Sequence, residues 1–187
     1  QMGSRTVIGG KGLTTAAGMH VPLIVSWPTR AMAGKVCSDL VDSTDFLPTV
    51  VEAAGAKLPA GHQIDGRSFL PQVRGQKGSP RDWIYSWYSQ RQQANLSVRE
   101  CAFNTRYKLY RTGEFYDLTG DREEQDALTV ASLSGERAAA AKSLQTVLDQ
   151  FTHVRDPKLD KLGLESIEGK KSDDAAKGNK AKGARKK

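Results

Sequence analysis

Four short segments between residues 82 and 118 decide the fold of the second half of the chain: DWIYSWYS (82–89), LSVRECAFN (96–104), RYKLYR (106–111) and GEFYDL (113–118). Each segment is rich in residues that favour strands, and polar turns separate them. Nine of the 13 aromatic residues of the chain (5 Phe, 3 Trp and 5 Tyr) lie in this region. The pattern predicts an antiparallel meander in which successive strands pair.

An amphipathic helix is predicted after the meander, from about Ser134 to Thr152. Its apolar stripe, at helical spacing, consists of Ala140, Ala141, Leu144, Val147, Leu148 and Phe151. We expect this stripe to pack on one face of the sheet. Residues 80–153 would then form a small α+β subdomain of antiparallel sheet and C-terminal helix.

A second helix is predicted in the first half of the chain, from about residue 43 to residue 55. Ser43 or Thr44 can cap its start, Pro48 falls in or near its first turn, and Gly55 is placed to end it. Its apolar stripe consists of Phe46, Leu47, Val50, Val51 and Ala54.

The segment VPLIVSWP at residues 21–28 is apolar nearly throughout, and three of its residues are β-branched. Such a run favours a strand buried on both faces, as in the parallel sheets of α/β proteins. SFLPQVRG at residues 68–75 favours one more helical turn. We therefore expect residues 1–79 to be the end of a larger α/β domain.

The positive charge of the chain is concentrated at its end. Residues 169–187 carry eight Lys or Arg and two Asp, which is +6 of the net +7. No large apolar residue interrupts residues 169–187, so they are predicted to be disordered. The basic tail as a whole is taken as residues 154–187. It could serve solubility or contact an acidic polymer, but no aromatic residue lies between the lysines, so no nucleic-acid partner is expected.

No apolar run approaches the roughly 18 residues that a membrane span needs, so no membrane span is predicted. Gln1 is followed by no basic and apolar leader, and the sequence alone does not indicate a compartment. Cys37 and Cys101 exclude a four-Cys zinc site, and whether they pair stays open.

The stretch GGKG at residues 9–12 is the first candidate for chemistry. A lysine among glycines can approach an anionic oxygen closely, although a solvated Lys11 in a flexible loop is the simpler interpretation. His20 could line the same cleft, and a structural role is equally open. No two histidines stand at metal-ligand spacing, so no metal site is predicted.

An acidic cluster follows the last predicted strand and consists of Asp117, Asp121, Glu123, Glu124 and Asp126. It is interpreted as a turn followed by a solvated face.

Four stretches together resemble the sulfatase family of the alkaline-phosphatase-like superfamily, in particular bacterial arylsulfatase-type sequences. They are GGKGLTTAAGMHVPLIVSWP (9–28), DSTDFLPTVVEAAGAKLP (42–59), IDGRSFLPQVRG (64–75) and RYKLYRTGEFYDLTGDREE (106–124). They stand in the family's order and cover roughly residues 9–128. The chain therefore resembles the C-terminal third of a sulfatase, with residues 1–79 as the end of its large domain.

The resemblance implies hydrolysis of sulfate esters with a formylglycine nucleophile and a bound calcium ion. The family's sulfate-contacting lysine corresponds to Lys11, as a catalytic residue, and His20 stands where other residues of the family's loop would bind substrate. Exported relatives favour a periplasmic or extracellular location for the complete protein.

The resemblance also implies what this chain does not supply. Neither Cys37 nor Cys101 fits the C/S-x-P-S-R motif from which formylglycine is made. Ser26 begins a loose S-x-P-x-R match, but it corresponds to the end of the expected strand. The calcium ligands would lie before Gln1, so the chain alone is expected to be inactive and to need the N-terminal sulfatase portion as its partner.

Two other functions stay open. The first is a phosphatase, phosphodiesterase or phosphonate hydrolase of the same superfamily, which the metal ligands upstream of Gln1 would reveal. The second is a non-catalytic module that binds acidic polymers through the tail, which salt-dependent binding would reveal.

Overall fold

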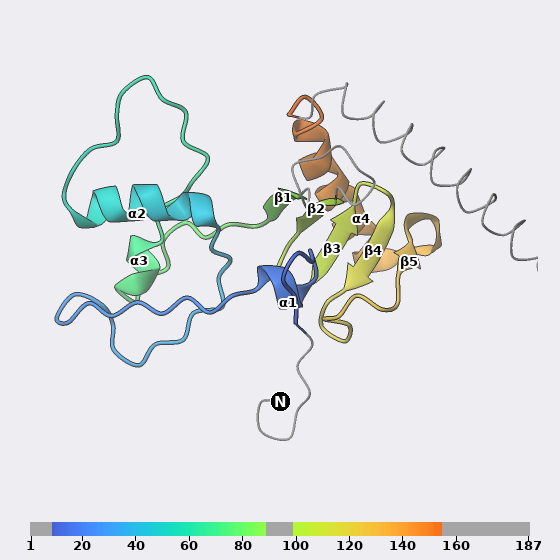
Figure 1. Ribbon diagram of the computed structural model, residues 1–187, viewed down its shortest axis with the longest axis horizontal. Coiled ribbons are helices and arrows are strands. Elements are labelled where there is room, and N and C mark those ends of the chain that lie inside the picture. Colours follow the sequence, from blue (N-terminus) through green and yellow to red (C-terminus); the bar gives the residue numbers. More distant parts are fainter. Residues whose placement is uncertain (1–8, 89–98, 155–187) are drawn as a thin grey trace, which may run out of the picture.

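The computed structural model describes residues 9–88 and 99–154. Its chain forms two lobes (Figure 1), one with helices α2 and α3 among long loops, the other with a sheet, α1 and α4. The predicted basic tail lies outside the described residues, apart from Val154. Every helix in the described part is too short or too polar to span a bilayer.

The sheet is the predicted antiparallel meander. Its strands are β1 (Ile84–Tyr88), β2 (Arg99–Phe103), β3 (Tyr107–Tyr110), β4 (Glu114–Asp117) and the short β5 (Leu128–Thr129), in the order β1-β2-β3-β4-β5. All neighbours are antiparallel. Because side chains alternate along each strand, the sheet has two distinct faces.

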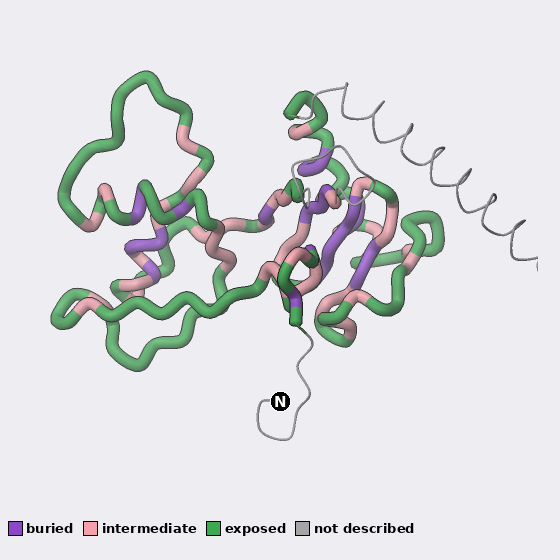
Figure 2. The backbone as a smooth tube through the Cα atoms, in the orientation of Figure 1, coloured by how far each residue is buried: buried purple, intermediate pink, exposed green. Residues whose placement is uncertain are grey.

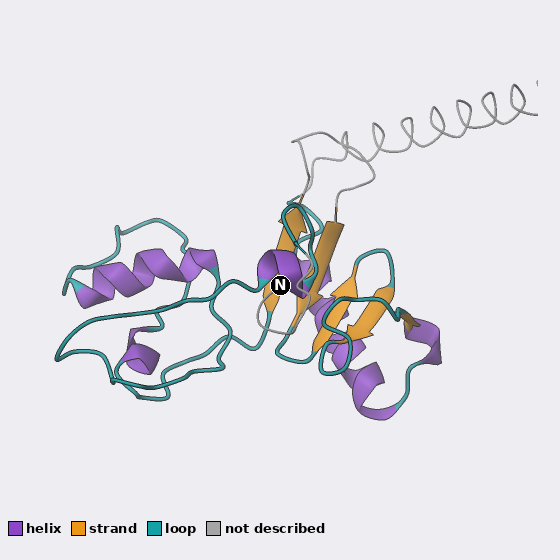
Figure 3. Cartoon of the chain, turned by 60° about the horizontal axis from the view of Figure 1, so that its bottom comes forward, coloured by secondary structure: helices purple, strands orange, loops and turns teal. Residues whose placement is uncertain are grey.

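Helix α4 (Gly135–Gln150) covers one face of the sheet, as the sequence predicts (Figure 3). The core between them is a cluster of buried residues: Ala102, Tyr107, Leu109, Phe115, Ala141, Leu144, Val147 and Leu148. After the helix, the Phe151 ring stacks on Tyr85 with 3.9 Å between centroids. The apolar stripe predicted for α4 is therefore the one that packs on the sheet.

The opposite face of the sheet carries a second buried cluster, Cys101, Tyr110 and Tyr116. The short helix α1 (Ala16–Met19) lies against this face, as Figure 1 shows, and Lys108 of β3 contacts Met19 with 3.8 Å between Nζ and Sδ. The segment that contains the candidate Lys11 is thus placed on the sheet, on the side away from α4.

In the other lobe, α2 (Phe46–Ala53) and α3 (Leu70–Val73) occupy the predicted positions. A 3-10 turn, η1 (Ser43–Asp45), precedes α2, so the cap differs from the prediction. Asp42, not Ser43 or Thr44, is the capping side chain, and it caps η1; Asp45, the N-cap residue of α2, makes no side-chain cap bond. Gly55 follows α2 with a φ of 67°, as a helix-ending glycine should.

Asp45 connects this lobe internally. Its side chain is only 2% exposed, and it accepts hydrogen bonds from the Arg67 N–H (2.6 Å) and Arg81 Nε (2.7 Å). Burial alone would raise the pKa of Asp45, but the hydrogen bonds from Arg81, Arg67 and the Asp42 N–H outweigh it and lower the pKa. One carboxylate thus ties together η1, the segment before α3 and the segment that leads into β1.

The predicted strand at residues 21–28 is wrong. The segment is irregular, and Figure 2 shows most of this lobe exposed. Val21 is 70% exposed and Ile24 88% exposed. A strand needs a hydrogen-bonding neighbour, and none of the described strands lies beside this segment.

The apolar stripe of α2 is also more exposed than its pattern suggests. Phe46 is 44%, Leu47 54% and Val50 63% exposed, whereas Pro48 and Thr49 are buried. The periodicity predicts the helix correctly, but within the described residues little covers its apolar side.

Candidate functional site

Lys11 lies in a tight turn immediately before α1. The turn is closed by a hydrogen bond from the Leu13 N–H to the Gly10 carbonyl (2.9 Å), and Gly12 takes a left-handed φ of 81° that favours glycine. The Lys11 side chain is exposed. Among the described residues it makes no ion pair.

The loop around Lys11 is folded tightly on itself. A Cβ at Gly10 would lie 2.0 Å from the backbone carbonyl carbon of Ala17, and one at Gly18 would lie 2.0 Å from the Leu13 carbonyl oxygen. Both positions therefore require glycine, because any side chain would push the loop and α1 apart. The backbone of residues 10–18 is thus closely packed although Lys11 itself is exposed.

The sheet holds this loop through Thr14, which is 7% exposed. The Thr14 hydroxyl hydrogen-bonds to the Tyr110 hydroxyl (2.9 Å), and Lys108 Nζ donates to the Thr14 carbonyl. Glu124 completes the arrangement: its Oε1 lies 2.8 Å from Lys108 Nζ, and its Oε2 accepts from the Tyr110 hydroxyl (2.5 Å). We call Thr14, Lys108, Tyr110 and Glu124 the anchor cluster.

The anchor cluster is buried and charge-balanced. The side chains of Lys108 and Glu124 are each 3% exposed, so each charge is compensated by the other. Burial, and next the hydrogen bond to Glu124, raise the pKa of Tyr110, which keeps its hydroxyl protonated as a donor. Glu124 has a left-handed φ of 57°, a costly conformation for a residue other than glycine.

The position of Glu124 corrects the interpretation of the acidic cluster as a solvated face. Its neighbours Glu123 and Asp126 are exposed, but Glu124 points into the sheet to meet Lys108. The sequence signal is weak, because the burial of Lys108 among the four buried residues of β3 is visible only in the structure. A buried lysine calls for a carboxylate partner. Nothing in the sequence tells which acid that is.

His20, the second candidate, ends the same segment. It follows α1, its N–H donates to the Ala16 carbonyl (2.9 Å), and its side chain is exposed. Lys11 and His20 thus stand at the two ends of one short unit on the sheet. Neither lines the pocket described next.

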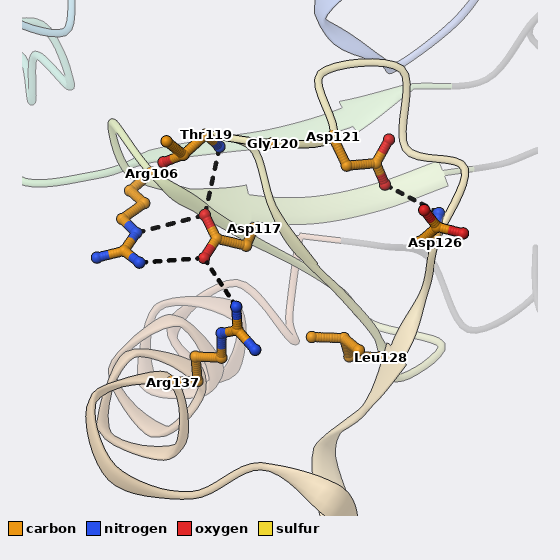
Figure 4. Close-up of a pocket in the computed structure, with 8 residues that line it drawn as sticks. All are labelled: Arg106, Asp117, Thr119, Gly120, Asp121, Asp126, Leu128 and Arg137. Carbon is orange, nitrogen blue, oxygen red and sulfur yellow. Dashed lines mark hydrogen bonds and ion pairs between the residues drawn. The ribbon is translucent and has the colours of Figure 1, made fainter.

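An open pocket lies between β4, the loop that follows it and the start of α4 (Figure 4). Asp117 accepts from Arg106 Nη2 (3.2 Å) and from Arg137 Nη2 (3.3 Å), and Arg106 also pairs with Glu136 (3.1 Å). The hydrogen bond from Arg106 is the main cause of the lowered pKa of Asp117. Because acids on the protein already neutralise both arginines, this network joins β4 to α4 and offers no unpaired cation.

The described residues do not fit the calcium ion or the formylglycine of the sulfatase resemblance. No group of three or more His, Cys, Asp or Glu in the described part could hold a metal ion. Both cysteines are free; Cys37 is exposed, and burial raises the pKa of Cys101 to about 11, so its thiol is inert. Ser26 is exposed and is followed by a turn rather than a helix.

Comparison with known proteins gives a consistent result. Residues 10–153 match the family model described as N-sulphoglucosamine sulphohydrolase, C-terminal. Steryl-sulfatase of Mus musculus is 42% identical over 67 residues, which are 36% of this chain and 11% of that protein. Ulvan-active sulfatase of Formosa agariphila is 35% identical over 78 residues, 42% of this chain and 15% of that protein.

Arylsulfatase A of Bos taurus is 33% identical over 100 residues, 52% of this chain and 19% of that protein. Among solved structures, a 2-O GAG sulfatase is 25% identical with a TM-score of 0.45, over 57% of this chain and 23% of its own. The chain thus spans less than a fifth of the length of each of these three curated relatives.

Proposed function

This chain belongs to the family of sulfatase C-terminal portions described as N-sulphoglucosamine sulphohydrolase, C-terminal, and from that premise we propose that the complete protein hydrolyses sulfate esters. The observation that carries the proposal is the closely packed glycine loop that presents Lys11, exposed and without an ion pair among the described residues. Lys11 is proposed as the residue that contacts the sulfate group, and His20 as a substrate-binding residue.

The chemistry of Lys11 follows from the charge that moves during the reaction. Cleavage of a sulfate ester transfers negative charge to the leaving oxygen, and a fixed ammonium stabilises that charge more in the transition state than in the ground state. The glycines beside Lys11 shape the turn that carries it: Gly10 packs against the Ala17 backbone, and Gly12 takes the left-handed φ of 81°. Because the loop is closely packed and closed by a backbone hydrogen bond, we expect little reorganisation when the substrate binds.

Residues outside this chain would complete the site. The described residues do not fit calcium or formylglycine, so both are assigned to the remainder of the complete protein. We also propose that residues 1–79 end the large α/β domain and that residues 80–153 form its C-terminal subdomain. The exposed apolar side chains of residues 21–50 support this division, because a larger domain would cover them.

The test is Lys11→Ala in the complete protein. The rate on an aryl sulfate is expected to fall by roughly 10²- to 10³-fold, the usual loss for one preorganised donor to a developing negative charge. Lys11→Arg should restore only part of it, because a planar guanidinium does not replace a compact ammonium at a close contact. Lys35→Ala is the matched control, since Lys35 is also exposed and next to a glycine.

The assay also separates the proposal from its rivals. Faster turnover of an aryl phosphate than of the aryl sulfate would replace the sulfatase by a phosphatase of the same superfamily. Wild-type kinetics for Lys11→Ala would remove Lys11 from the site. For His20→Ala, a higher KM with little change in kcat is expected, because the proposed role is binding.

A further inference from the structure

We infer that Lys108, Tyr110 and Glu124 are positioning residues for the reaction: they hold the Lys11 loop against the sheet so that the lysine ammonium stays where the substrate meets it. This inference rests on the proposed role of Lys11. It extends the site from an exposed loop to three buried side chains that lie about 100 residues further along the chain.

The contacts of the anchor cluster reach the loop at one residue close to Lys11. Thr14 is three positions after Lys11, and the sheet binds both its carbonyl, through Lys108, and its hydroxyl, through Tyr110. Leu13 directly precedes Thr14, and the bond from its N–H to the Gly10 carbonyl (2.9 Å) closes the turn that carries Lys11. A shift of Thr14 therefore moves the whole turn, and with it the lysine.

Lys108 does not serve as a second cation for the substrate. Its side chain is 3% exposed, and its ammonium is occupied by Glu124 Oε1 at 2.8 Å and by the Thr14 carbonyl. Its other neighbours are Met19 Sδ at 3.8 Å and the rings of Tyr110 at 4.9 Å and Phe103 at 5.6 Å. A buried cation with all of its partners on the protein can act only through the loop that it holds.

The strained backbone of Glu124 supports the same role. A residue with a φ of 57° is kept only where its surroundings require it. In this conformation the carboxylate of Glu124 bonds both Lys108 and Tyr110. Removing the carboxylate would leave the ammonium that holds Thr14 without its counter-charge.

The test is Lys108→Met combined with Glu124→Gln in the complete protein, which removes both charges and leaves neither buried alone. The matched control is Arg111→Met with Glu100→Gln. That ion pair joins the same two kinds of charge (2.6 Å) on the opposite face of the sheet and holds the Leu148 carbonyl instead of Thr14. Both pairs stabilise the sheet, but only the first contacts the loop.

Two measurements separate positioning from simple stabilisation. Amide hydrogen exchange in residues 10–19 should quicken at least about 10-fold in the anchor variant and stay unchanged in the control. kcat on an aryl sulfate should fall by roughly 10- to 100-fold in the anchor variant alone, since misplacement of a catalytic group by about 1 Å costs that much. An equal loss of kcat in both variants would overturn the inference.

A double-mutant cycle with Lys11→Ala completes the test. If the anchor acts through Lys11, adding the anchor variant to Lys11→Ala should cause little further loss, because the lysine to be positioned is already gone. Full multiplication of the two losses would overturn the inference. If Lys11→Ala alone changes nothing, the proposed role of Lys11 fails, and exchange confined to residues 10–19 then decides whether the anchor exists.

Tyr110→Phe keeps the test usable if the charge variant does not fold. It removes one hydroxyl and its bonds to Thr14 and Glu124, and leaves the ring in the core. We expect faster exchange in residues 10–19 and a several-fold lower kcat, with KM nearly unchanged. Tyr85→Phe, which removes a hydroxyl bonded to Glu100 on the other face (2.9 Å), should show neither effect, and equal effects would refute the inference.

Discussion

Two buried carboxylates show how single residues hold this chain together. Glu124 binds a lysine and a tyrosine of β3, whereas Asp45 binds an arginine and two backbone N–H groups in the other lobe. Both neutralise a cation that is itself almost buried, so their loss would leave an uncompensated charge. Each therefore matters more to its lobe than an exposed ion pair would.

Asp45→Ala tests how much this single carboxylate contributes to the free energy of unfolding. The substitution leaves the guanidinium of Arg81 unpaired in a site where it is 10% exposed, and about 3 kcal/mol of stability should be lost. Urea denaturation, monitored by hydrogen exchange of the amides in α2, measures this loss of stability. Asp39→Ala is the control, because Asp39 is exposed, and a similar loss there would show that the effect is not specific to the pair.

The same carboxylate predicts a pH dependence. The pKa of Asp45 is lowered below its usual value of 3.8, so the folded state binds its proton less tightly than the unfolded state. Its contribution to stability is fully present above pH 3.8 and is lost as the pH falls through the lower folded pKa. As the pH falls through this range, the free energy of unfolding of the lobe that contains α2 should decrease in the wild type. In Asp45→Asn, this free energy should depend less on pH over the same range.

At the scale of elements, the sequence predicts a helix or a strand correctly when the pattern that specifies it lies within one segment. The spacing of Leu144 and Leu148 places α4, and the turn residues between aromatic segments place the meander, because each pattern depends only on its own residues. The segment at residues 21–28 fails as a prediction because a strand also depends on its neighbour. Glu124 fails for a related reason: its burial depends on Lys108, and polarity alone suggests solvent.

Leu144→Ala tests the packing of α4 on the sheet. Leu144 is 1% exposed within the main core, so truncation should cost about 2–5 kcal/mol through lost burial and the cavity left behind. The unfolding midpoint in urea would report it. Gln145→Ala is the neighbouring control: it is exposed and loses only a hydrogen bond to Asp149 (2.8 Å), which is worth a few tenths of a kcal/mol.

For the whole molecule, the two lobes are predicted to differ in local stability in the isolated chain. Strands β2 to β4 and α4 enclose a buried core, whereas residues 21–40 are largely exposed and form no helix or paired strand. Amides of the sheet and of α4 should therefore exchange orders of magnitude more slowly than those of residues 21–40. Uniform protection across both lobes would contradict this picture.

The isolated chain is also predicted to lack sulfatase activity. The role proposed for Lys11 is only to stabilise charge, and the described residues provide neither a metal cluster nor a cysteine in the formylglycine motif. The 187-residue chain, assayed on an aryl sulfate with added calcium, should show no turnover above buffer. Turnover would direct attention to Ser26, the one residue with a partial match to that motif.

The distance along the chain between Thr14 and its partners sets an order of events during synthesis. Tyr110 is 96 residues and Lys108 94 residues from Thr14, and Glu124 is made later still. At about 5–20 residues per second, a ribosome adds such a stretch in roughly 5–20 s. Until then the loop at residues 10–18 cannot form its hydrogen bonds to the sheet. A nascent chain, or a product of premature termination before residue 124, therefore carries Lys11 without the support that fixes its position.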